Sequence, residues 1–261
     1  MSAMPAVYQV EGRYVRSGAG AAGPWDPKMQ HGAGPAALVA WVAEHLDTEE
    51  PMRIARLTLD LLRPVPVAPL EIRSEIIRQG RKIQVASICL LAQGVEVVRA
   101  SVMKVRVSDP GAPSELAAVA LNYPAPEASH ELKGEQRVKA AFLEGISARL
   151  ASGAMRRPGP AAIWFRANQA IVEGERTSPV MRAAIAADFC NGVSSMLDMK
   201  KWSFINADMT LHMARPPIGE WILVDAETWL GPDGGGTAMG RLADSTGYFG
   251  RAAQSLIIEP R

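Results

Sequence analysis

The feature of this sequence that most constrains its fold is an internal repeat. The segment 55–64 (ARLTLDLLRP) recurs in diluted form as the segment 207–216 (ADMTLHMARP), which lies 152 positions later. Identical residues recur at this offset in the pairs Ala55/Ala207, Thr58/Thr210, Leu59/Leu211, Arg63/Arg215, Pro64/Pro216, Glu75/Glu227, Leu90/Leu242, Arg99/Arg251 and Ala100/Ala252. A repeat of this length indicates two domain-sized copies rather than a solenoid of small repeats. The 261 residues suffice for two domains of roughly 100 to 130 residues each.

Composition and charge argue against some classes of binding partner and cellular location. The chain carries 28 basic and 27 acidic residues, a formal net charge of +1, which argues against binding to nucleic acid or to an anionic membrane. The first ten residues lack the charged and apolar regions of a signal peptide, and the sequence has no apolar run of about 18 residues. Cys89 and Cys190 lie among apolar neighbours, as reduced buried thiols do. We therefore expect a soluble, cytoplasmic protein.

The first copy is predicted to form one helix followed by an antiparallel sheet. Residues 36–46 are good helix formers, and the proline just before them suits a first helical turn. Residues 53–62 alternate with period two, so they predict a half-buried strand. Its core-facing side chains are predicted to be Ala55, Leu57, Leu59 and Leu61. Further strands separated by glycine-containing turns are predicted over residues 70–78, 82–91 and 95–107.

The second copy repeats this order after a linker. Residues 108–126 are rich in Pro, Ala and Ser, and residues 137–150 predict one amphipathic helix. A long helix is predicted over residues 179–199, followed by a strand over residues 203–214 that keeps the alternation of its counterpart. The other strands of this copy are predicted over residues 163–168, 221–230, 237–243 and 248–259. The predicted fold class is therefore α+β, with units 1–107 and 159–261 joined by a segment 108–158.

Asp188 is the sharpest candidate for a functional residue. It falls on the apolar stripe of the second predicted helix, whose other members are Met181, Ala184, Ile185, Phe189 and Met196. An unpaired buried carboxylate costs several kcal/mol, so we expect Asp188 either to be hydrogen-bonded for structure or to line a cavity. A surface or helix-capping position is the alternative. At the repeat offset the counterpart of Asp188 is Ala36.

Two polar replacements accompany Asp188 in the same copy. Asn206 stands where the first copy has Ile54, and Gln254 stands where it has Val102. Surface drift is the alternative explanation for each change taken alone. A carboxylate and two amides are, however, the groups needed to orient and deprotonate one water molecule. We therefore predict a catalytic site at Asp188, Asn206 and Gln254.

Other kinds of site are less well supported by the sequence. It contains no Gly-x-Ser-x-Gly motif and no His and Cys spacing typical of a metal site, so no metal is expected. The glycine-rich run 231–236 lies between predicted strands, which indicates a hairpin loop rather than a phosphate-binding loop. His31 lies just before the first predicted helix and is a candidate for capping it.

Four short patterns carry a family resemblance: residues 163–168 (IWFRAN), Ala187-Asp188, residues 206–216 with their Arg-Pro ending, and the final strand with Gln254. In these patterns the chain resembles the hotdog-fold thioesterases, and in particular the double-hotdog acyl-CoA thioesterases of the bacterial thioesterase II type. The resemblance implies a double hotdog, in which two tandem units, each a long helix wrapped by an antiparallel sheet, form a pseudo-dimer.

The resemblance also implies a site and a reaction. Asp188 falls on the catalytic aspartate of that family and Gln254 on its glutamine, whereas Asn206 falls where the family typically has threonine. Some hotdog proteins carry a His-Gly pair before the first helix, so His31, Gly32 and Gly34 are candidate substrate-binding residues. The implied activity is hydrolysis of acyl-CoA to free acid and coenzyme A by a water that Asp188 activates, without a cofactor.

Two other functions stay open at this point. A hotdog protein that binds acyl-CoA without turnover is one of them, because Asn206 departs from the family pattern. The other is an enoyl-thioester hydratase, which is disfavoured because that chemistry pairs an aspartate with a histidine and the second predicted helix has no histidine. Exposed sheet edges favour association, so we also expect a homo-oligomer.

Overall fold

The computed structural model describes residues 4–111, 113, 120–154 and 157–261. Within the segment 108–158, which the sequence predicts to join the two units, residues 112, 114–119 and 155–156 lie outside the described residues. The strands of the first half are β1 (Tyr8–Glu11), β2 (Tyr14–Ser17), β3 (Met52–Leu61), β4 (Leu70–Gln79), β5 (Ile83–Ala92) and β6 (Val95–Arg106). Those of the second half are β7 (His130–Glu131), β8 (Ile146–Ser152), β9 (Ala161–Ala167), β10 (Trp202–Asn206), β11 (Asp208–Met213), β12 (Ile222–Leu230), β13 (Gly235–Asp244) and β14 (Gly247–Pro260). The helices are α1 (Ala33–Glu44), α2 (Ala141–Glu144), α3 (Pro179–Asp188) and α4 (Cys190–Val193).

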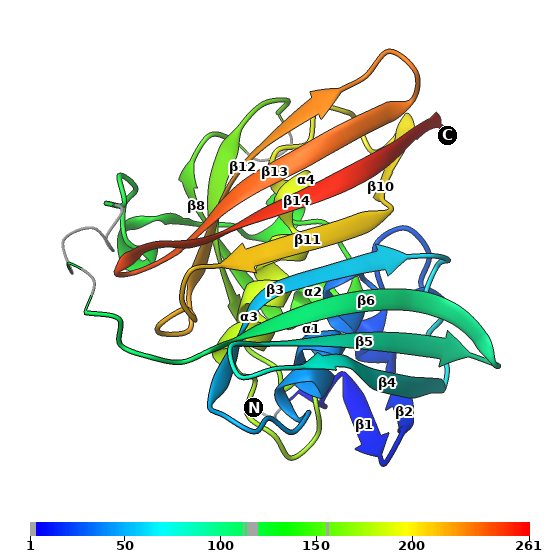
Figure 1. The fold of residues 1–261 in the computed structure, drawn as a ribbon. Helices are drawn as coiled ribbons and strands as arrows, with labels where there is room; N and C mark the ends of the chain where they lie inside the picture. Colours follow the sequence, from blue (N-terminus) through cyan, green and yellow to red (C-terminus); the bar gives the residue numbers. More distant parts are fainter. Residues whose placement is uncertain (1–3, 112, 114–119, 155–156) are drawn as a thin grey trace.

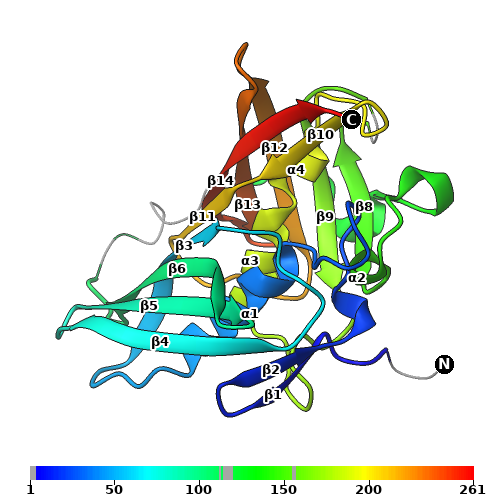
Figure 2. The same ribbon diagram turned by 90° about the vertical axis from the view of Figure 1, so that its right-hand side faces the viewer.

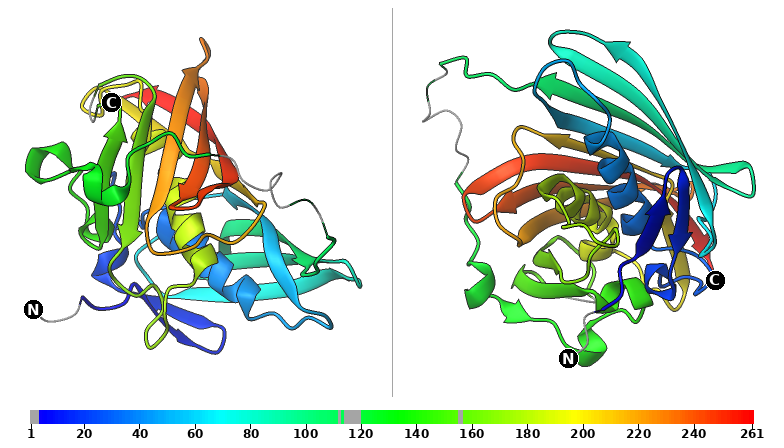
Figure 3. Two further views of the ribbon diagram at one scale, coloured as in Figure 1. Left: turned by 90° about the vertical axis from the view of Figure 1, so that its left-hand side faces the viewer. Right: turned by 90° about the horizontal axis from the view of Figure 1, so that it is seen from below.

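The described strands form one 14-stranded sheet that runs through both halves (Figure 1). Its order is β1-β2-β4-β5-β6-β3-β11-β14-β13-β12-β9-β8-β7, and β10 also pairs with β14. The sheet curves around α1 and α3, which pack against each other on its concave side (Figures 2 and 3). Helix α1 is lined with buried alanines, which have small side chains and therefore let the two helices approach closely. This is the α+β architecture of two helix-and-sheet units that the repeat predicts.

The repeat is preserved in the register of the sheet. In the first half Leu59 of β3 pairs with Ala100 of β6, and in the second half Leu211 of β11 pairs with Ala252 of β14. Each residue of the second pair lies 152 positions after its counterpart in the first. The same offset relates β4–β5 to β12–β13 and β5–β6 to β13–β14. A slip of one residue in either copy would turn its apolar side chains away from the core, so both copies keep the register.

The two halves meet at equivalent residues. Strands β3 and β11 pair antiparallel with Thr58 opposite Thr210, and the two hydroxyls lie 3.2 Å apart. These threonines are counterparts in the repeat, so the β3–β11 junction has the self-complementary form of a two-fold dimer interface. The chain is thus a pseudo-dimer built from one polypeptide.

The alternation of buried and exposed side chains is interrupted once in each copy, within β3 and between β10 and β11, and this differs from the sequence prediction. The pairing of β3 with β6 shifts between Ile54 and Arg56, which leaves Ile54 buried and Ala55 only half-buried. In the second copy Ala207 separates β10 from β11 at the same position. An extra residue of this kind reverses the direction of the side chains that precede it. The prediction that Ala55 faces the core was therefore wrong, and Asn206, like Ile54, points towards the helices.

Two predicted helices differ from the structure. Residues 137–150 form the four-residue α2 and then strand β8, in which Ile146 and Ala148 are buried with period two. Pairing with β9 outweighs the helix propensity of this segment. The predicted helix 179–199 ends at Asp188 and is followed by the short α4, so Met196 lies beyond the helices and is exposed. The division into units 1–107 and 159–261 stays a prediction, although β7 and β8 extend the sheet of the second half.

Candidate active site

Asp188 is the last residue of α3, and only 8% of its surface is exposed. Helices α1 and α3 are antiparallel, since the cap of α3, Ser178, donates to Glu44 at the end of α1 over 2.6 Å. The carboxylate of Asp188 therefore faces the start of α1 in the other half of the chain. The interpretation of Asp188 as a surface residue is excluded by its burial.

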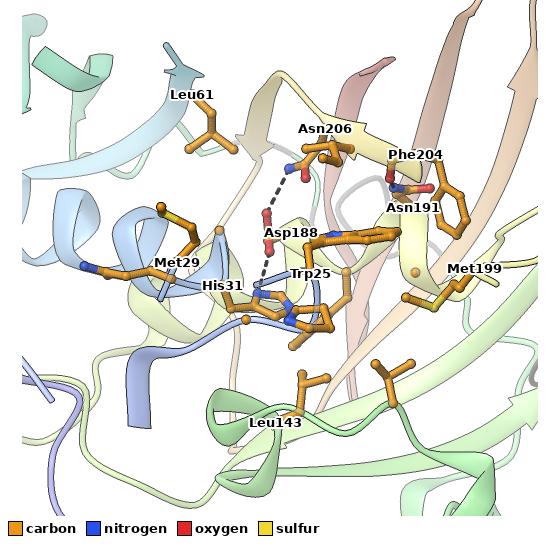
Figure 4. A pocket seen from close by; sticks show the side chains of 18 of the residues that line it. Trp25, Met29, His31, Leu61, Leu143, Asp188, Asn191, Met199, Phe204 and Asn206 are labelled. Atoms are coloured by element: carbon orange, nitrogen blue, oxygen red, sulfur yellow. Dashed lines mark hydrogen bonds and ion pairs between the residues drawn. The ribbon is translucent and has the colours of Figure 1, made fainter. Parts of the chain in front are cut away.

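The carboxylate of Asp188 is held between a side chain from each half, as Figure 4 shows. Its Oδ1 accepts a hydrogen bond of 3.0 Å from Nδ2 of Asn206, the last residue of β10. Its Oδ2 lies 3.0 Å from Nδ1 of His31, in the segment before α1. An ionised carboxylate has only acceptor sites, about four in all, so two donors satisfy it in part and leave lone pairs free for a water or a substrate.

Gly32 is required by this arrangement. A Cβ atom placed on Gly32 would lie 2.6 Å from Oδ1 of Asp188, a distance that carbon and oxygen side-chain atoms do not reach without displacement. The glycine therefore lets the carboxylate lie against the backbone at the start of α1. Gly34, the third residue of the predicted substrate-binding set, faces Tyr8 instead, since an added Cβ would lie 2.7 Å from the Tyr8 hydroxyl, and it does not line the cavity described below.

His31 is oriented by aromatic rings and by Asp188. Its imidazole stacks on Phe142 with a centroid distance of 5.1 Å and meets the edge of Phe189 at 5.3 Å. Nδ1 also lies 3.2 Å from the backbone N–H of Ala33. One ring nitrogen cannot accept from Ala33 and donate to Asp188 at once, and the charge-assisted bond to the carboxylate is the stronger of the two. We therefore assign the proton to Nδ1, which leaves Nε2 as the acceptor of the neutral ring.

Gln254 lies behind the carboxylate and contacts the backbone. It is 1% exposed on β14 and is not among the residues that line the cavity. Its Nε2 donates to the carbonyl of Asp188 over 3.1 Å, and its Oε1 accepts from the N–H of Asn191 over 3.0 Å. The amide thus engages a backbone acceptor and a backbone donor at the break between α3 and α4. A side chain inserted into the hydrogen-bond ladder explains why the predicted long helix ends here.

The polar groups open into a cavity of about 720 Å³ between the two halves. Its lining comes from the segment before α1, the end of β3, the segment 132–148, strand β9, the α3–α4 break and β10. Besides His31, Asp188 and Asn206, the cavity is lined mainly by apolar and aromatic side chains, among them Phe165 and Phe189. Figure 4 shows Trp25, Leu143 and Phe204 from the same lining. Asn191, which the sequence did not single out, also lines it and donates to the carbonyl of Phe204.

The residue of the first half that is equivalent to Asp188 in the structure differs from the one that the repeat offset gives. At the offset of 152 that counterpart is Ala36, but Ala36 lies in the first turns of α1. The last residue of α1 is Glu44, as Asp188 is the last residue of α3. The helix ends are offset by 144 rather than 152 positions, because the stretch from Asp188 to Asn206 is eight residues longer than the stretch from Glu44 to Ile54. Glu44 is therefore the structural counterpart of Asp188.

Neither cysteine is arranged for nucleophilic catalysis. Burial, together with the charge of Asp188, raises the pKa of the Cys190 thiol to about 12, so the thiolate nucleophile is not formed near neutral pH. Cys89 on β5 is half-buried, and burial likewise raises its pKa. Among the described residues no group of three or more His, Cys, Asp or Glu side chains is placed to hold a metal ion. No described helix is both long and apolar enough to cross a membrane.

Structures of other proteins with the same fold cover nearly the whole chain. A protein with a hot dog fold from Alicyclobacillus acidocaldarius has a TM-score of 0.76 at 15% identity, over 97% of this chain and 95% of that chain. A proposed thioesterase from Novosphingobium aromaticivorans gives 0.72 at 21% identity, over 98% and 99%. An acyl-CoA thioesterase II from Mycobacterium marinum gives 0.65 at 14% identity, over 97% and 94%. The predicted double-hotdog fold is confirmed.

Sequence models of known protein families match both halves. The model of the acyl-CoA thioesterase N-terminal domain matches residues 21–105, and the model of the acyl-CoA thioesterase C-terminal domain matches residues 113–258. No curated protein sequence matches the chain. Since the C-terminal model alone spans more than half of the residues and the N-terminal model most of the rest, this double-hotdog protein belongs to the acyl-CoA thioesterase family.

Proposed function

We propose that this protein hydrolyses acyl-CoA thioesters to a free acid and coenzyme A, and that Asp188 is the general base. The observation that carries the proposal is the buried Asp188 carboxylate, which bonds Asn206 from its own half and His31 from the other at the wall of a largely apolar cavity. Membership of the acyl-CoA thioesterase family supports the same substrate class. A concave, mainly apolar pocket with a few convergent polar groups is the usual form of a small-molecule site.

The reaction can be written with these groups. Asp188 accepts a proton from a water whose oxygen attacks the thioester carbonyl carbon, and the carbonyl oxygen becomes an oxyanion. The bond between carbon and sulfur then breaks, and the proton passes to the sulfur of coenzyme A. Gly32 lines the cavity at the start of α1, so backbone N–H groups at the positive end of that helix are the proposed donors to the oxyanion.

The other polar residues position the base in this proposal. Asn206 and His31 fix the two oxygens of Asp188, and Gln254 holds the backbone at Asp188 and Asn191. Gln254 is thus proposed as a positioning residue rather than as a ligand of the attacking water. Asn206 donates to Asp188 at the position where the thioesterase II type typically has threonine. Its amide can serve in place of a hydroxyl because it can both donate and accept hydrogen bonds.

The test is release of free thiol from a panel of acyl-CoA thioesters. Wild-type protein is expected to release thiol well above the rate without enzyme, and Asp188→Asn is expected to lose that activity while keeping its melting temperature. The enzyme proposal fails if no thioester is hydrolysed above background. Saturable binding of acyl-CoA without any thiol release would instead support the non-catalytic binding protein.

Hydration of an enoyl thioester is the second candidate. The sequence argument against it was that the second helix has no histidine, but the structure places His31 from the first half 3.0 Å from Asp188. A histidine and a carboxylate in contact are the groups that add water across a conjugated double bond by acid–base catalysis. A trans-2-enoyl-CoA substrate separates the two reactions: hydration removes the enoyl absorbance without releasing thiol, whereas hydrolysis releases thiol.

Assembly stays a prediction, and the two ends of the sheet differ in how far their edges are covered. The outer edge of β1 is covered by residues 171–173 of the same chain, through bonds to the backbone of Tyr8. The other end of the sheet is β7, whose residues His130 and Glu131 are exposed. We propose association through β7. A sedimentation mass equal to one chain of 28.0 kDa would contradict it.

A further inference from the structure

A second, smaller cavity lies at the other end of the helix pair, beside Glu44. Its volume is about 330 Å³, and its lining comes from both halves of the chain. The first half contributes the end of α1, the start of β3 and Lys104 of β6, and the second half contributes the start of α3 and Pro216 after β11. The proposed reaction uses none of these residues. The cavity therefore lies at the end equivalent to the catalytic one and has a lining of its own.

The side chain that distinguishes this cavity is Lys104. Lysine is rarely buried without a partner, yet Lys104 is only 4% exposed. In the sheet it pairs with Ile54, as Leu256 pairs with Asn206 in the second half. Each residue of the second pair lies 152 positions after its counterpart. The first half thus has a buried cation where the second half has a leucine, so the copies have diverged in charge at this end as well.

The ammonium group of Lys104 has donors to spare. An ammonium carries three N–H groups, and within the described part of the chain its one hydrogen bond is to the carbonyl of Leu46, at 2.7 Å. Burial lowers the pKa of Lys104, whereas the charges of Glu44 and Asp47 oppose that shift. A buried cation with too few acceptors is costly. An anion in the cavity would therefore stabilise the charged form of Lys104.

The rest of the lining favours a small anion that has an apolar part. Arg53 adds a second positive charge, and its guanidinium is fixed at the junction of the halves by bonds to the carbonyls of Met213 and Ala214. Two cations against one carboxylate, Glu44, leave the lining with a formal charge of +1. A volume of about 330 Å³ suits a molecule of a few carbon atoms. The other lining side chains are apolar: Met52, Ile54, Pro179, Val180 and Pro216.

We propose that this cavity binds a short-chain monocarboxylate such as butyrate, with its carboxylate at the ammonium of Lys104 and its alkyl chain against Ile54 and Val180. Charge-assisted hydrogen bonds of this kind are roughly twice as strong as neutral ones. Val180 is the second residue of α3, where backbone N–H groups lack intrahelical partners, so its N–H is a further donor at the positive end of the helix. The inference goes beyond the proposed hydrolysis, although the free acid that hydrolysis releases belongs to the same chemical class.

Calorimetric titration with sodium butyrate tests the site. Wild type is expected to bind butyrate more tightly than butyramide, which has the same size without the charge, and more tightly than inorganic phosphate, which lacks the apolar part. Lys104→Met is expected to weaken butyrate binding about tenfold or more, because it removes the charge and its donors. Lys82→Met removes an exposed charge just before β5 and is the matched control, with no change expected. Equal affinities of wild type and Lys104→Met for butyrate would overturn the proposal.

A second variant keeps the test decisive if Lys104→Met does not fold. Glu44→Gln preserves Lys104 and removes a like charge from a partly exposed position, so it is expected to bind butyrate about threefold more tightly. Unchanged or weaker binding by this variant would contradict the proposal.

Methyl NMR spectra locate the bound acid. The signals of Ile54 and Val180 are expected to shift on addition of butyrate, and shifts confined to Ile163 in the catalytic cavity would overturn the assignment. These measurements do not depend on turnover. Butyrate binding that requires Lys104, together with no thiol release from any thioester, would refute the hydrolase and leave this site standing.

Discussion

At one end of the helix pair Asp188 contacts His31 and Asn206, and at the other end Glu44 contacts Ser178 and lines a small pocket with Ile54. Each carboxylate is the last residue of its helix, and each faces the start of the opposite helix. The repeat pairs Asn206 with Ile54 and Gln254 with Val102. The two ends therefore have one backbone plan and different side chains.

The difference lies in burial as much as in chemistry. Asp188 is buried beside a cavity of about 720 Å³, whereas Glu44 is more exposed beside one of about 330 Å³, where partial burial still raises the pKa of its carboxyl. Water competes for hydrogen bonds at an exposed carboxylate and lowers its electrostatic effect, while a buried one acts in a low dielectric. Duplication thus supplied two equivalent positions, and the second half of the chain carries the polar residues at one of them. Reciprocal substitutions at the two ends of the helix pair test whether only the Asp188 end supports turnover.

The largest expected effect is at the two carboxylates. Asp188→Asn is expected to lower kcat by about 10³-fold, because it removes the proposed base while preserving the shape of the side chain. Glu44→Gln is expected to change kcat by less than about twofold, since surface substitutions away from a site have small effects. Thiol release measures both, and melting temperatures show that both variants are folded. Equal losses in the two variants would mean that both ends contribute to turnover.

The next largest effect is expected from exchanging Asn206 and Ile54, the equivalent residues that precede the interruption of the strand in each copy. Asn206→Ile gives this end the residue of the other and leaves Asp188 without its bond of 3.0 Å from Nδ2. A loss of about 10²-fold in kcat is expected, as for removal of one oriented donor. Ile54→Asn is the reciprocal change and is expected to create no activity at the Glu44 end, measured in the Asp188→Asn background. Activity in that double variant would contradict the assignment of the site to one end.

The arginines at the Arg-Pro ends of the two copies, Arg215 and Arg63, are expected to contribute differently to stability. Arg215 bonds the buried Asp244, whereas its counterpart Arg63 donates to an exposed backbone carbonyl. Burial opposes the ionisation of Asp244, but hydrogen bonds from Arg215, Thr246 and the backbone outweigh it and lower the pKa to about 2. Because the folded pKa lies below the usual 3.8, this group stabilises the fold by about 2 kcal/mol above pH 4, and the contribution is lost as pH falls to about 2.

Urea denaturation at neutral pH and near pH 3 measures this effect. Asp244→Asn is expected to be less stable than wild type at neutral pH, with the gap narrowing at acid pH. Arg63→Ala is the matched control in the other half and is expected to cost less than about 0.5 kcal/mol. The comparison fails if Arg63→Ala and Arg215→Ala destabilise the protein equally.

The smallest expected effect comes from the glycine beside the carboxylate. Gly32→Ala is expected to lower kcat about tenfold, because its Cβ would lie 2.6 Å from Oδ1 of Asp188 and must displace it. Gly192→Ala lies in the wall of the same cavity, where a Cβ meets nothing within 4 Å, and a smaller loss is expected. A similar loss for both glycines would show that the cavity, and not the position of Asp188, is sensitive to an added methyl group.

The sequence by itself determined the repeat, most of the strands and the half of the chain that carries the polar residues. Alternation with period two predicted the strands of the meanders because it reflects which side of a sheet is buried, a local property. Asp188 was predicted as a site residue because a carboxylate on the apolar stripe of a helix needs a partner or a cavity. Asn206 and Gln254 were predicted as site residues because the two copies can be compared residue by residue within one chain.

Tertiary structure decided which of these side chains meet and in what role. His31 and Asp188 come from different halves, and their contact depends on the antiparallel packing of α1 and α3, which no local pattern encodes. The bend at Ala207 turns Asn206 towards the helices, and the amide of Gln254 ends α3 at Asp188. Each of these features depends on contacts between residues distant in the chain, whereas periodicity reports only the burial of neighbouring residues.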